Sequence, residues 1–274
     1  MKDFRGILLS MNYIKKIIFH AAKVFLPKWA KEELIIFRNM FVKNINNFNL
    51  YKDSVLNNKG VEIGGPSNIF QREIPVYRYL KSLDGVNYNI NTIWEGSISE
   101  GINYLFYKRK PIGYQFISEA TDMRKIADQS YDFIISSNCL EHSTNPLKAL
   151  REWRRIIKRN GSLILVLPKK DLNFDHKRKY TKFSTLLNAY KNDYDEANLN
   201  ALDEILEHHD ISRDGGIDNF EDFKTRSLNN FENRCLHHYV YSKDLIKEML
   251  VSTDFRLVDV GETMYDYYAL ADRI

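Results

Sequence analysis

The chain has 274 residues, of which 44% are hydrophobic and 28% are charged, with a formal net charge of +4 at neutral pH. This composition excludes global disorder, and the mild charge without a long Lys/Arg stripe argues against a nucleic-acid-binding protein. The two cysteines, Cys139 and Cys235, have neither metal-ligand nor disulfide-framework spacing. We therefore expect a reduced, cytoplasmic setting.

The first 50 residues are expected to form a basic amphipathic extension with nine Lys/Arg and three Asp/Glu. Apolar residues recur at helical spacing over 14–25 and again over 34–41, with Pro27 between the two runs. No run approaches the roughly 18 apolar residues that span a bilayer, and lysines interrupt what would otherwise look like a signal peptide. Two interpretations stay open. The helix lies on the inner membrane face as a peripheral contact, or it packs on the domain or a partner subunit.

From residue 51 onwards, predicted strands alternate with helices. The strands are expected over 61–63, 79–86, 116–120, 131–136, 162–167, 255–260 and 265–271, and the helices over 68–78, 146–158 and 241–250. Asn160-Gly161 is expected to end the second helix. Residues 170–235 are polar and mostly helical, which predicts a cap inserted over the carboxyl edge of the sheet. The pattern indicates one α/β domain over 51–274, with a doubly wound, mostly parallel, seven-stranded Rossmann-like sheet.

A Gly-rich turn, Glu62-Ile63-Gly64-Gly65-Pro66-Ser67, follows the first predicted strand. Glycine lets the backbone approach a ligand closely, and the N–H groups of such a turn face the anionic part of the ligand. Polar residues are also expected at the carboxyl ends of the next three strands, where ligands of doubly wound sheets bind. Each of them alone is equally well explained as a strand-end cap, but their coincidence indicates a nucleotide site. They are Asp84, Thr121, Asp122, Ser137 and Asn138.

Short motifs between residues 117 and 167 indicate a family. They are Glu119-Ala120-Thr121-Asp122, Tyr131-Asp132-Phe133-Ile134, Leu140-Glu141-His142, Asn145-Pro146, Leu150-Arg151-Glu152-Trp153, Arg155-Ile156-Ile157-Lys158 and Gly161. With these motifs, the chain from about residue 60 to 168 resembles the small-molecule class I methyltransferases of the type-11 group. The resemblance implies a methyltransferase fold and S-adenosyl-L-methionine as the cofactor.

The resemblance also implies where the cofactor lies. It places the methionyl end on Gly64 and Gly65, in the turn that includes Glu62 and Pro66, the ribose on Asp84, the adenine near Thr121 and Asp122, and the sulfonium near Ser137 and Asn138. The turn departs from the usual Gly-x-Gly, which leaves the detailed carboxylate contacts open. The same departure disfavours a dinucleotide-binding dehydrogenase, which requires Gly-x-Gly-x-x-Gly.

A general base is expected above the strand ends, because methyl transfer to oxygen or nitrogen removes a proton. His176 is the first candidate and His238 the second, with Asp175 to orient an imidazole and His142 after the fourth strand. A structural or surface role is the alternative for each histidine. The same cluster is an alternative site for a divalent metal that binds a diol or phosphate, but no spacing matches a recognised metal motif, so the prediction includes no metal.

These features predict a methyltransferase that acts on an oxygen of a small polar acceptor. The resembling group includes many bacterial enzymes that modify surface glycans, so the expected acceptor is a sugar or phosphorylated precursor in polysaccharide biosynthesis. Two alternatives stay open. One is a non-catalytic methyltransferase-like scaffold in a glycan-assembly complex. The other is methylation of a macromolecule, against which the absence of Asn/Asp-Pro-Pro-Tyr/Phe after the fourth strand argues. The oligomeric state is left open.

Overall fold

The computed structural model describes residues 44–108 and 110–274. The two amphipathic runs predicted over 14–25 and 34–41 lie outside these residues, so the extension over 1–50 stays a prediction. The first described helix is α3 (Phe48–Val55), which the sequence did not predict. Within the described part of the chain, no helix is long and apolar enough to cross a membrane.

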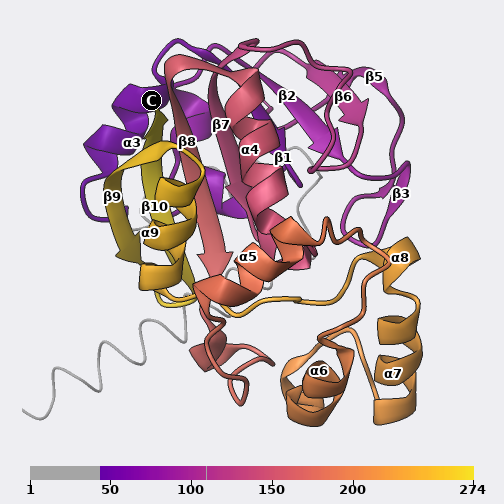
Figure 1. The fold of residues 1–274 in the computed structure, drawn as a ribbon. Helices are drawn as coiled ribbons and strands as arrows, with labels where there is room; N and C mark the ends of the chain where they lie inside the picture. The colour runs from indigo at the N-terminus through magenta and orange to yellow at the C-terminus, as the bar shows by residue number, and fades with distance from the viewer. Residues whose placement is uncertain (1–43, 109) are drawn as a thin grey trace, which may run out of the picture.

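A single large sheet organises the domain (Figure 1). Its strands are β1 (Lys59–Ile63), β2 (Ser82–Asn87), β5 (Gly101–Tyr104), β6 (Gly113–Ile117), β7 (Tyr131–Ser137), β8 (Ile157–Pro168), β9 (Phe255–Glu262) and β10 (Asp266–Arg273). They lie in the order β5-β6-β2-β1-β7-β8-β10-β9. The strands from β6 to β8 are parallel, whereas β5 is antiparallel to β6 and β10 to both of its neighbours. The predicted doubly wound, mostly parallel sheet is therefore confirmed, with β5 as an eighth strand beyond the seven expected.

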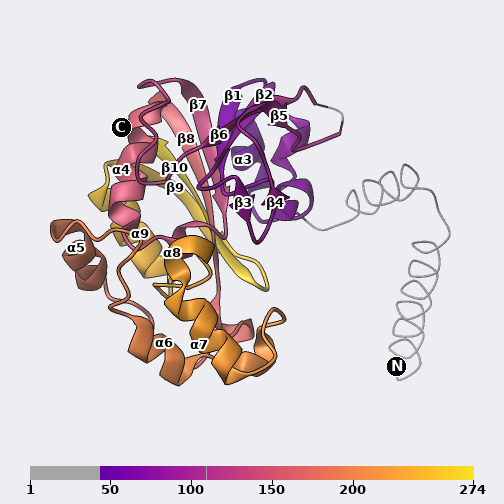
Figure 2. The same cartoon turned by 90° about the vertical axis from the view of Figure 1, so that its right-hand side faces the viewer.

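Helices cover both faces of this sheet and give three layers (Figure 2). On one face, α4 (Pro146–Ile156) and α9 (Lys243–Ser252) bury Leu150, Trp153 and Met249 in the larger core cluster. On the other face, Tyr51 of α3 packs with two turns of 3₁₀ helix in the second cluster. Both faces of the sheet are thus apolar, which is why β7 and β8 each contain a run of buried hydrophobic residues, 133–135 and 163–167.

Local sequence sets the start of α4. The Asn145 side chain accepts a hydrogen bond from the backbone N–H of Lys148 at 3.2 Å, and Pro146 stands at the first helical position, where no N–H is required. This N-cap fixes the helix directly after the loop that leaves β7. The loop's residues, 138–145, are thereby held at the carboxyl edge of the sheet.

Two predicted elements were wrong. Residues 68–78 form two turns of 3₁₀ helix, Asn68–Gln71 and Val76–Arg78, because Pro75 restricts its own φ and disfavours helical geometry in the residue before it. Asn160-Gly161 does not end the helix, since α4 stops at Ile156 and β8 begins at Ile157. Asn160 has φ 60° within β8, where the pairing with β7 shifts register, and Asn and Gly accommodate that backbone.

The segment between β8 and α9 contains α5 (Phe183–Lys191), α6 (Leu202–His208), α7 (Phe220–Leu228) and α8 (Asn230–Asn233). Leu186 and Ala189 of α5 belong to the large core cluster. In contrast, α6, α7 and α8 lie beyond the carboxyl edge of the sheet (Figures 1 and 2), with a small apolar cluster around Ile205, Phe223 and Leu236. We call residues 195–237 the cap.

Candidate active site

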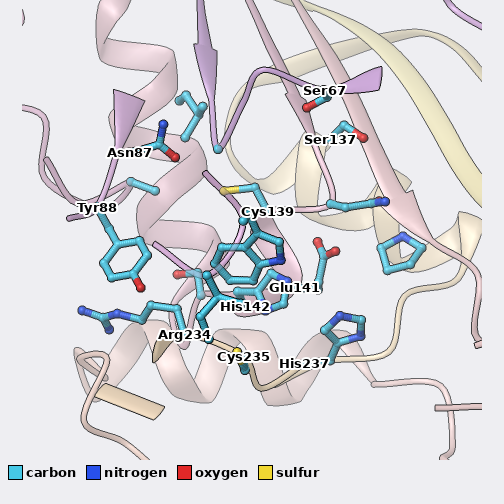
Figure 3. A pocket seen from close by; sticks show the side chains of 18 of the residues that line it. Ser67, Asn87, Tyr88, Ser137, Cys139, Glu141, His142, Arg234, Cys235 and His237 are labelled. Carbon is cyan, nitrogen blue, oxygen red and sulfur yellow. The ribbon is translucent and has the colours of Figure 1, made fainter. Parts of the chain in front are cut away.

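A cavity of about 670 Å³ lies between the carboxyl edge of the sheet and the cap. This volume is in the usual range of about 300–1,000 Å³ for small-molecule sites. Its floor comes from the ends of β1, β2, β6 and β7, and its roof from the cap and from Pro168, Asn173 and Phe174, which precede the cap (Figure 3). Residues from these strand ends include Gly64, Pro66, Ser67, Asn87, Tyr88, Ser118, Glu119, Ala120, Ser137, Asn138 and Cys139.

Neighbouring side chains pack closely against the turn after β1. Gly64 has φ +78°, and a Cβ at this position would lie 2.7 Å from the Cβ and Sγ atoms of Cys139. A Cβ on Gly65 would lie 2.1 Å from the carboxyl carbon of Glu62. Gly64 is therefore required by the close approach of the loop after β7, and Gly65 by the Glu62 side chain of β1. Gly64 and Pro66 line the cavity, whereas Gly65 does not.

Glu62 supports this turn from inside the protein. Its carboxylate accepts hydrogen bonds from the backbone N–H of Ser67 at 3.0 Å and from the hydroxyls of Tyr77 and Tyr104 at 2.6 and 2.7 Å. Burial raises the pKa of Glu62 to about 7, although these hydrogen bonds lower it. Glu62 is fully buried and does not line the cavity, so its position is that of an anchor behind the turn.

The second strand extends beyond its predicted end. Asp84 is the third residue of β2, and its carboxylate accepts hydrogen bonds from the N–H of Tyr114 and the hydroxyl of Tyr131, both at 2.8 Å. Asn87 is the last residue of β2 and lines the cavity, with its side-chain NH₂ donating to the carbonyl of Gly65 at 3.1 Å. The polar group that β2 presents to the cavity is therefore Asn87, and Asp84 joins β2 to its neighbour β6 and, across β1, to β7.

At the third strand, the cavity is lined by residues just before the predicted pair. Thr121 and Asp122 lie in the following turn, and the Asp122 side chain is 42% exposed and bound to Arg124. Glu119 lines the cavity, and Arg234 of the cap binds its carboxylate at 2.7 Å. Burial raises the pKa of Glu119, although Arg234 lowers it.

At the fourth strand, the predicted residues Ser137 and Asn138 both line the cavity (Figure 3 labels Ser137). Asn138 has φ 49°, which turns the chain sharply out of β7. The turn directs the next residues, Cys139 to His142, along the cavity wall. Trp94, half-exposed, also lines the cavity, and its ring centroid lies 5.0 Å from that of His142.

A cluster of titratable groups lines the cavity where the loop after β7 meets the end of the cap (Figure 3). The Nδ1 atom of His142 lies 3.1 Å from the carbonyl oxygen of Leu236, and Nδ1 of His237 lies 2.6 Å from the Asp175 carboxylate. Both Nδ1 atoms thus act as donors, so in the neutral form of each ring Nε2 is the acceptor. Beside them, the Glu141 carboxyl is fully buried.

The electrostatics of the two imidazoles differ. Burial and the neighbouring His237 hold the pKa of His142 well below its usual range. Burial lowers the pKa of His237 too, but the Asp175 and Glu141 carboxylates outweigh it and the net pKa is raised. Burial raises the pKa of Glu141 to about 7, against the attraction of His237. The cluster therefore includes groups that exchange protons near neutral pH.

Two of the predicted bases do not line this cavity. His176 pairs with the Asp210 carboxylate at 2.7 Å within the cap connection. His238 is buried next to Asn230, 3.2 Å from its amide nitrogen, and burial together with Arg178 lowers the pKa of His238 to about 3. Asp175 does not line the cavity either, but its carboxylate accepts a hydrogen bond from His237, which does.

Sequence reasoning did not select several of the cavity residues. His237 lies in the same short stretch as His238 but was passed over, and Glu141 was quoted only as part of a family motif. Arg234 was not considered, although it links the cap to the sheet through Glu119 and to Glu196 at 3.4 Å. The sequence feature that could have pointed to these residues is the pair Glu141-His142, which directly follows the end of a predicted strand.

A family model described as a methyltransferase domain matches residues 98–165, which include β5, β6, β7, α4 and most of β8. No curated protein matches the chain.

The fold is similar to solved S-adenosylmethionine-dependent methyltransferases. One from Aquifex aeolicus is 15% identical, with a TM-score of 0.44 and coverage of 84% of this chain and 90% of that chain. A putative one from Listeria monocytogenes is 12% identical, with a TM-score of 0.47 and coverage of 83% and 97%. One from Mesorhizobium loti is 8% identical, with a TM-score of 0.48 and coverage of 82% and 95%. Over residues 98–165, which include the strands β6 and β7 at the cavity, the chain is similar to a methyltransferase domain.

Proposed function

We propose that the protein transfers a methyl group from S-adenosylmethionine to an oxygen of a small polar acceptor. The observation that carries this proposal is the cluster of His142, His237 and Glu141 on the cavity wall, across from the strand ends that suit the cofactor. An oxygen acceptor must lose a proton, and in this cluster the pKa of Glu141 is raised to about 7 and that of His237 above its usual value, so both groups accept protons.

The cofactor is proposed to lie along the strand ends. The turn of Gly64, Pro66 and Ser67 would hold the methionyl carboxylate through backbone N–H groups, and Ser137 and Asn138 would lie beside the sulfonium. Relative to the sequence prediction, the ribose contact moves from Asp84 to Asn87, because Asn87 lines the cavity and Asp84 is bonded elsewhere. The fit is supported by the cavity size and by the crowded turn, which admits no side chain at Gly64 or Gly65.

The adenine contact is likewise proposed to move from Thr121 and Asp122 to Glu119 and Ala120, which line the cavity at the end of β6. A carboxylate such as Glu119 accepts a hydrogen bond from an exocyclic amino group. Arg234 holds this carboxylate in place from the cap side. The position of the cap and the binding of adenine would therefore both depend on Glu119.

The chain's own residues would position the acceptor and remove its proton. S-adenosylmethionine supplies a methyl group already activated by the positive sulfur, so alignment contributes much of the rate. We propose His237 as the proton acceptor through Nε2, in place of His176 and His238, because Asp175 fixes its tautomer. His142 stays a candidate beside it.

For the acceptor, we propose a sugar or a phosphorylated precursor used in bacterial surface polysaccharide synthesis. Its support is the polar lining opposite the strand ends, which includes the guanidinium groups of Arg226 and Arg234 and the cluster above. Such groups hydrogen-bond hydroxyls and phosphates. We also propose that the cap covers this site, and that the N-terminal extension contacts a membrane or a partner.

Mass spectrometry of acceptor mixtures tests the proposal. The protein is incubated with S-adenosylmethionine and panels of sugars, sugar phosphates, nucleotide-linked sugars, small RNAs and peptides. A gain of 14 Da on an oxygen of a sugar-type acceptor, about 10²–10⁴-fold slower with His237→Gln, is the expected result. Methylation confined to RNA or peptide would contradict the acceptor class, and equal rates for His237→Gln would contradict the base.

A further inference from the structure

Glu141, His142 and His237 bring three metal-ligand atoms together. One ligand-type atom of each residue lies within 4.8 Å of the other two. Glu141 and His142 belong to a turn of 3₁₀ helix, Leu140–His142, directly after β7, and His237 comes from the chain that returns from the cap. The cluster thus joins two segments that are about 95 residues apart in sequence, at the wall of the cavity.

The Glu141 carboxylate has no hydrogen-bond partner in the described part of the chain. The residue is 0% exposed, and both of its oxygens are buried without a donor. A buried carboxylate without donors is strongly unfavourable, so natural proteins pair such groups or use them to coordinate metals. Here the groups that face it are imidazole nitrogens, which are metal ligands themselves.

Both histidines make the hydrogen bond that is typical of metal-binding histidines. In such sites the ring nitrogen that does not bind metal donates to a carboxylate or a backbone carbonyl. His237 donates from Nδ1 to Asp175, and His142 donates from Nδ1 to the carbonyl of Leu236. Asp175 is itself fixed by the buried Arg178, at 2.9 Å. Both Nε2 atoms are therefore free to bind a cation, and their orientation is supported from outside the cluster.

We propose that Glu141, His142 and His237 bind a divalent transition-metal ion, with coordination positions left open toward the cavity. Two imidazoles and one carboxylate suit Zn²⁺, Co²⁺ or Fe²⁺ better than Mg²⁺ or Ca²⁺, which prefer oxygen ligands. Metal bonds of about 2.0–2.2 Å set tetrahedral ligand atoms about 3.3 Å apart. The distances between ligand atoms, which are within 4.8 Å, therefore need to shorten by at most about 1.5 Å.

The metal also gives the cavity a specific acceptor chemistry, and this step rests on the proposed function. An acceptor hydroxyl bound at an open position has a lowered pKa and loses its proton to solvent. The acceptor oxygen then forms a bond to the methyl carbon as the bond from that carbon to sulfur breaks, and the sulfur leaves as a neutral thioether. In this arrangement His237 holds the metal, and the metal takes over the removal of the proton that His237 performs in the metal-free site; the Co²⁺ titration below decides between these two roles of His237. Acceptors with adjacent oxygens, such as a diol or a phosphate ester, would be favoured.

Titration of full-length, tag-free, chelator-treated protein with Co²⁺ tests the proposal. Visible absorption of bound Co²⁺ is expected to saturate at one equivalent, and Zn²⁺ is expected to displace it. Glu141→Gln and His142→Gln should each weaken Co²⁺ binding at least about tenfold. The matched control is His176→Gln, which alters a histidine outside the cavity and should bind Co²⁺ as the unmodified protein does.

Stability measurements separate loss of a ligand from loss of the fold. Metal-free Glu141→Gln should unfold at the same temperature as the unmodified protein or higher, since it removes an unpaired buried charge. No saturable Co²⁺ binding, or binding equally tight in folded Glu141→Gln and His142→Gln, would overturn the metal site. S-adenosylhomocysteine binding is measured on the same metal-free protein, so failure of the cofactor site is seen separately from failure of the metal site.

Discussion

Replacement of Asp84 is expected to destabilise the sheet without altering cofactor affinity. The Asp84 side chain is 11% exposed and joins β2 to β6 and β7 through Tyr114 and Tyr131. Asp84→Ala leaves the Tyr114 N–H and the buried Tyr131 hydroxyl without their acceptor, and each loss costs about 1–3 kcal/mol. The half-exposed Lys59, at 3.1 Å, adds less than about 1 kcal/mol. The free energy of unfolding should therefore fall by about 2–6 kcal/mol.

Urea unfolding followed by fluorescence measures this loss, and calorimetric titration with S-adenosylhomocysteine measures the affinity. Asp84→Asn, which keeps one carbonyl acceptor, should lose less stability, about 1–2 kcal/mol, and bind the cofactor product within about twofold of the unmodified protein. The matched variant Asn87→Ala should weaken binding about 5–30-fold, for the loss of about 1–2 kcal/mol. The reasoning is refuted if stable Asp84→Asn loses affinity while Asn87→Ala keeps it.

Three further outcomes follow from the site. Gly65→Ala should abolish cofactor binding in folded protein, because a Cβ would collide with Glu62 and displace the turn; equal affinity by calorimetry would contradict this. Burial raises the pKa of Asp266 to about 6, so this group contributes stability that is lost as pH rises from about 4 to 6; in urea unfolding, Asp266→Asn should remove that contribution to the pH dependence, and a pH dependence unchanged by the substitution would contradict it. Arg234→Ala frees Glu119 and should speed proteolysis within the cap and weaken cofactor binding; unaltered digestion would count against the link.

The strands that fix the architecture were predictable because their sequence pattern reflects burial on both faces. Residues 162–167 are an unbroken run of apolar or small residues, and residues 131–136 are interrupted only by Asp132; the structure has them as most of β7 and half of β8. The edge strand β5 was missed, since Ile102 is 78% exposed and the strand carries no apolar alternation. The segment 68–78 was mispredicted because Pro75 divides it into two short turns.

The cavity residues were predictable only where they adjoin a strong strand signal. Gly64, Ser137 and Asn138 directly follow such strands, and all three line the cavity. Asp84 was chosen because it is acidic, but its partner Tyr131 is 47 residues away, and sequence does not reveal such a contact.

The sequence alone does not reveal which of His237 and His238 faces the cavity. Neighbouring residues of an extended segment point in opposite directions. Thus His237 lies on the cavity wall while His238 is buried beside Asn230. Which of two adjacent histidines faces the site depends on how the cap returns to the sheet.

The central claim is that the cavity at the strand ends binds the methyl donor. Isothermal titration of the purified full-length protein with S-adenosylmethionine, and separately with S-adenosylhomocysteine, tests this most directly. We predict micromolar, one-to-one binding of both, weakened in Asn87→Ala and retained in Asp84→Asn. Absence of binding to either by protein shown to be folded would contradict the cofactor site and favour a non-catalytic scaffold with a methyltransferase fold.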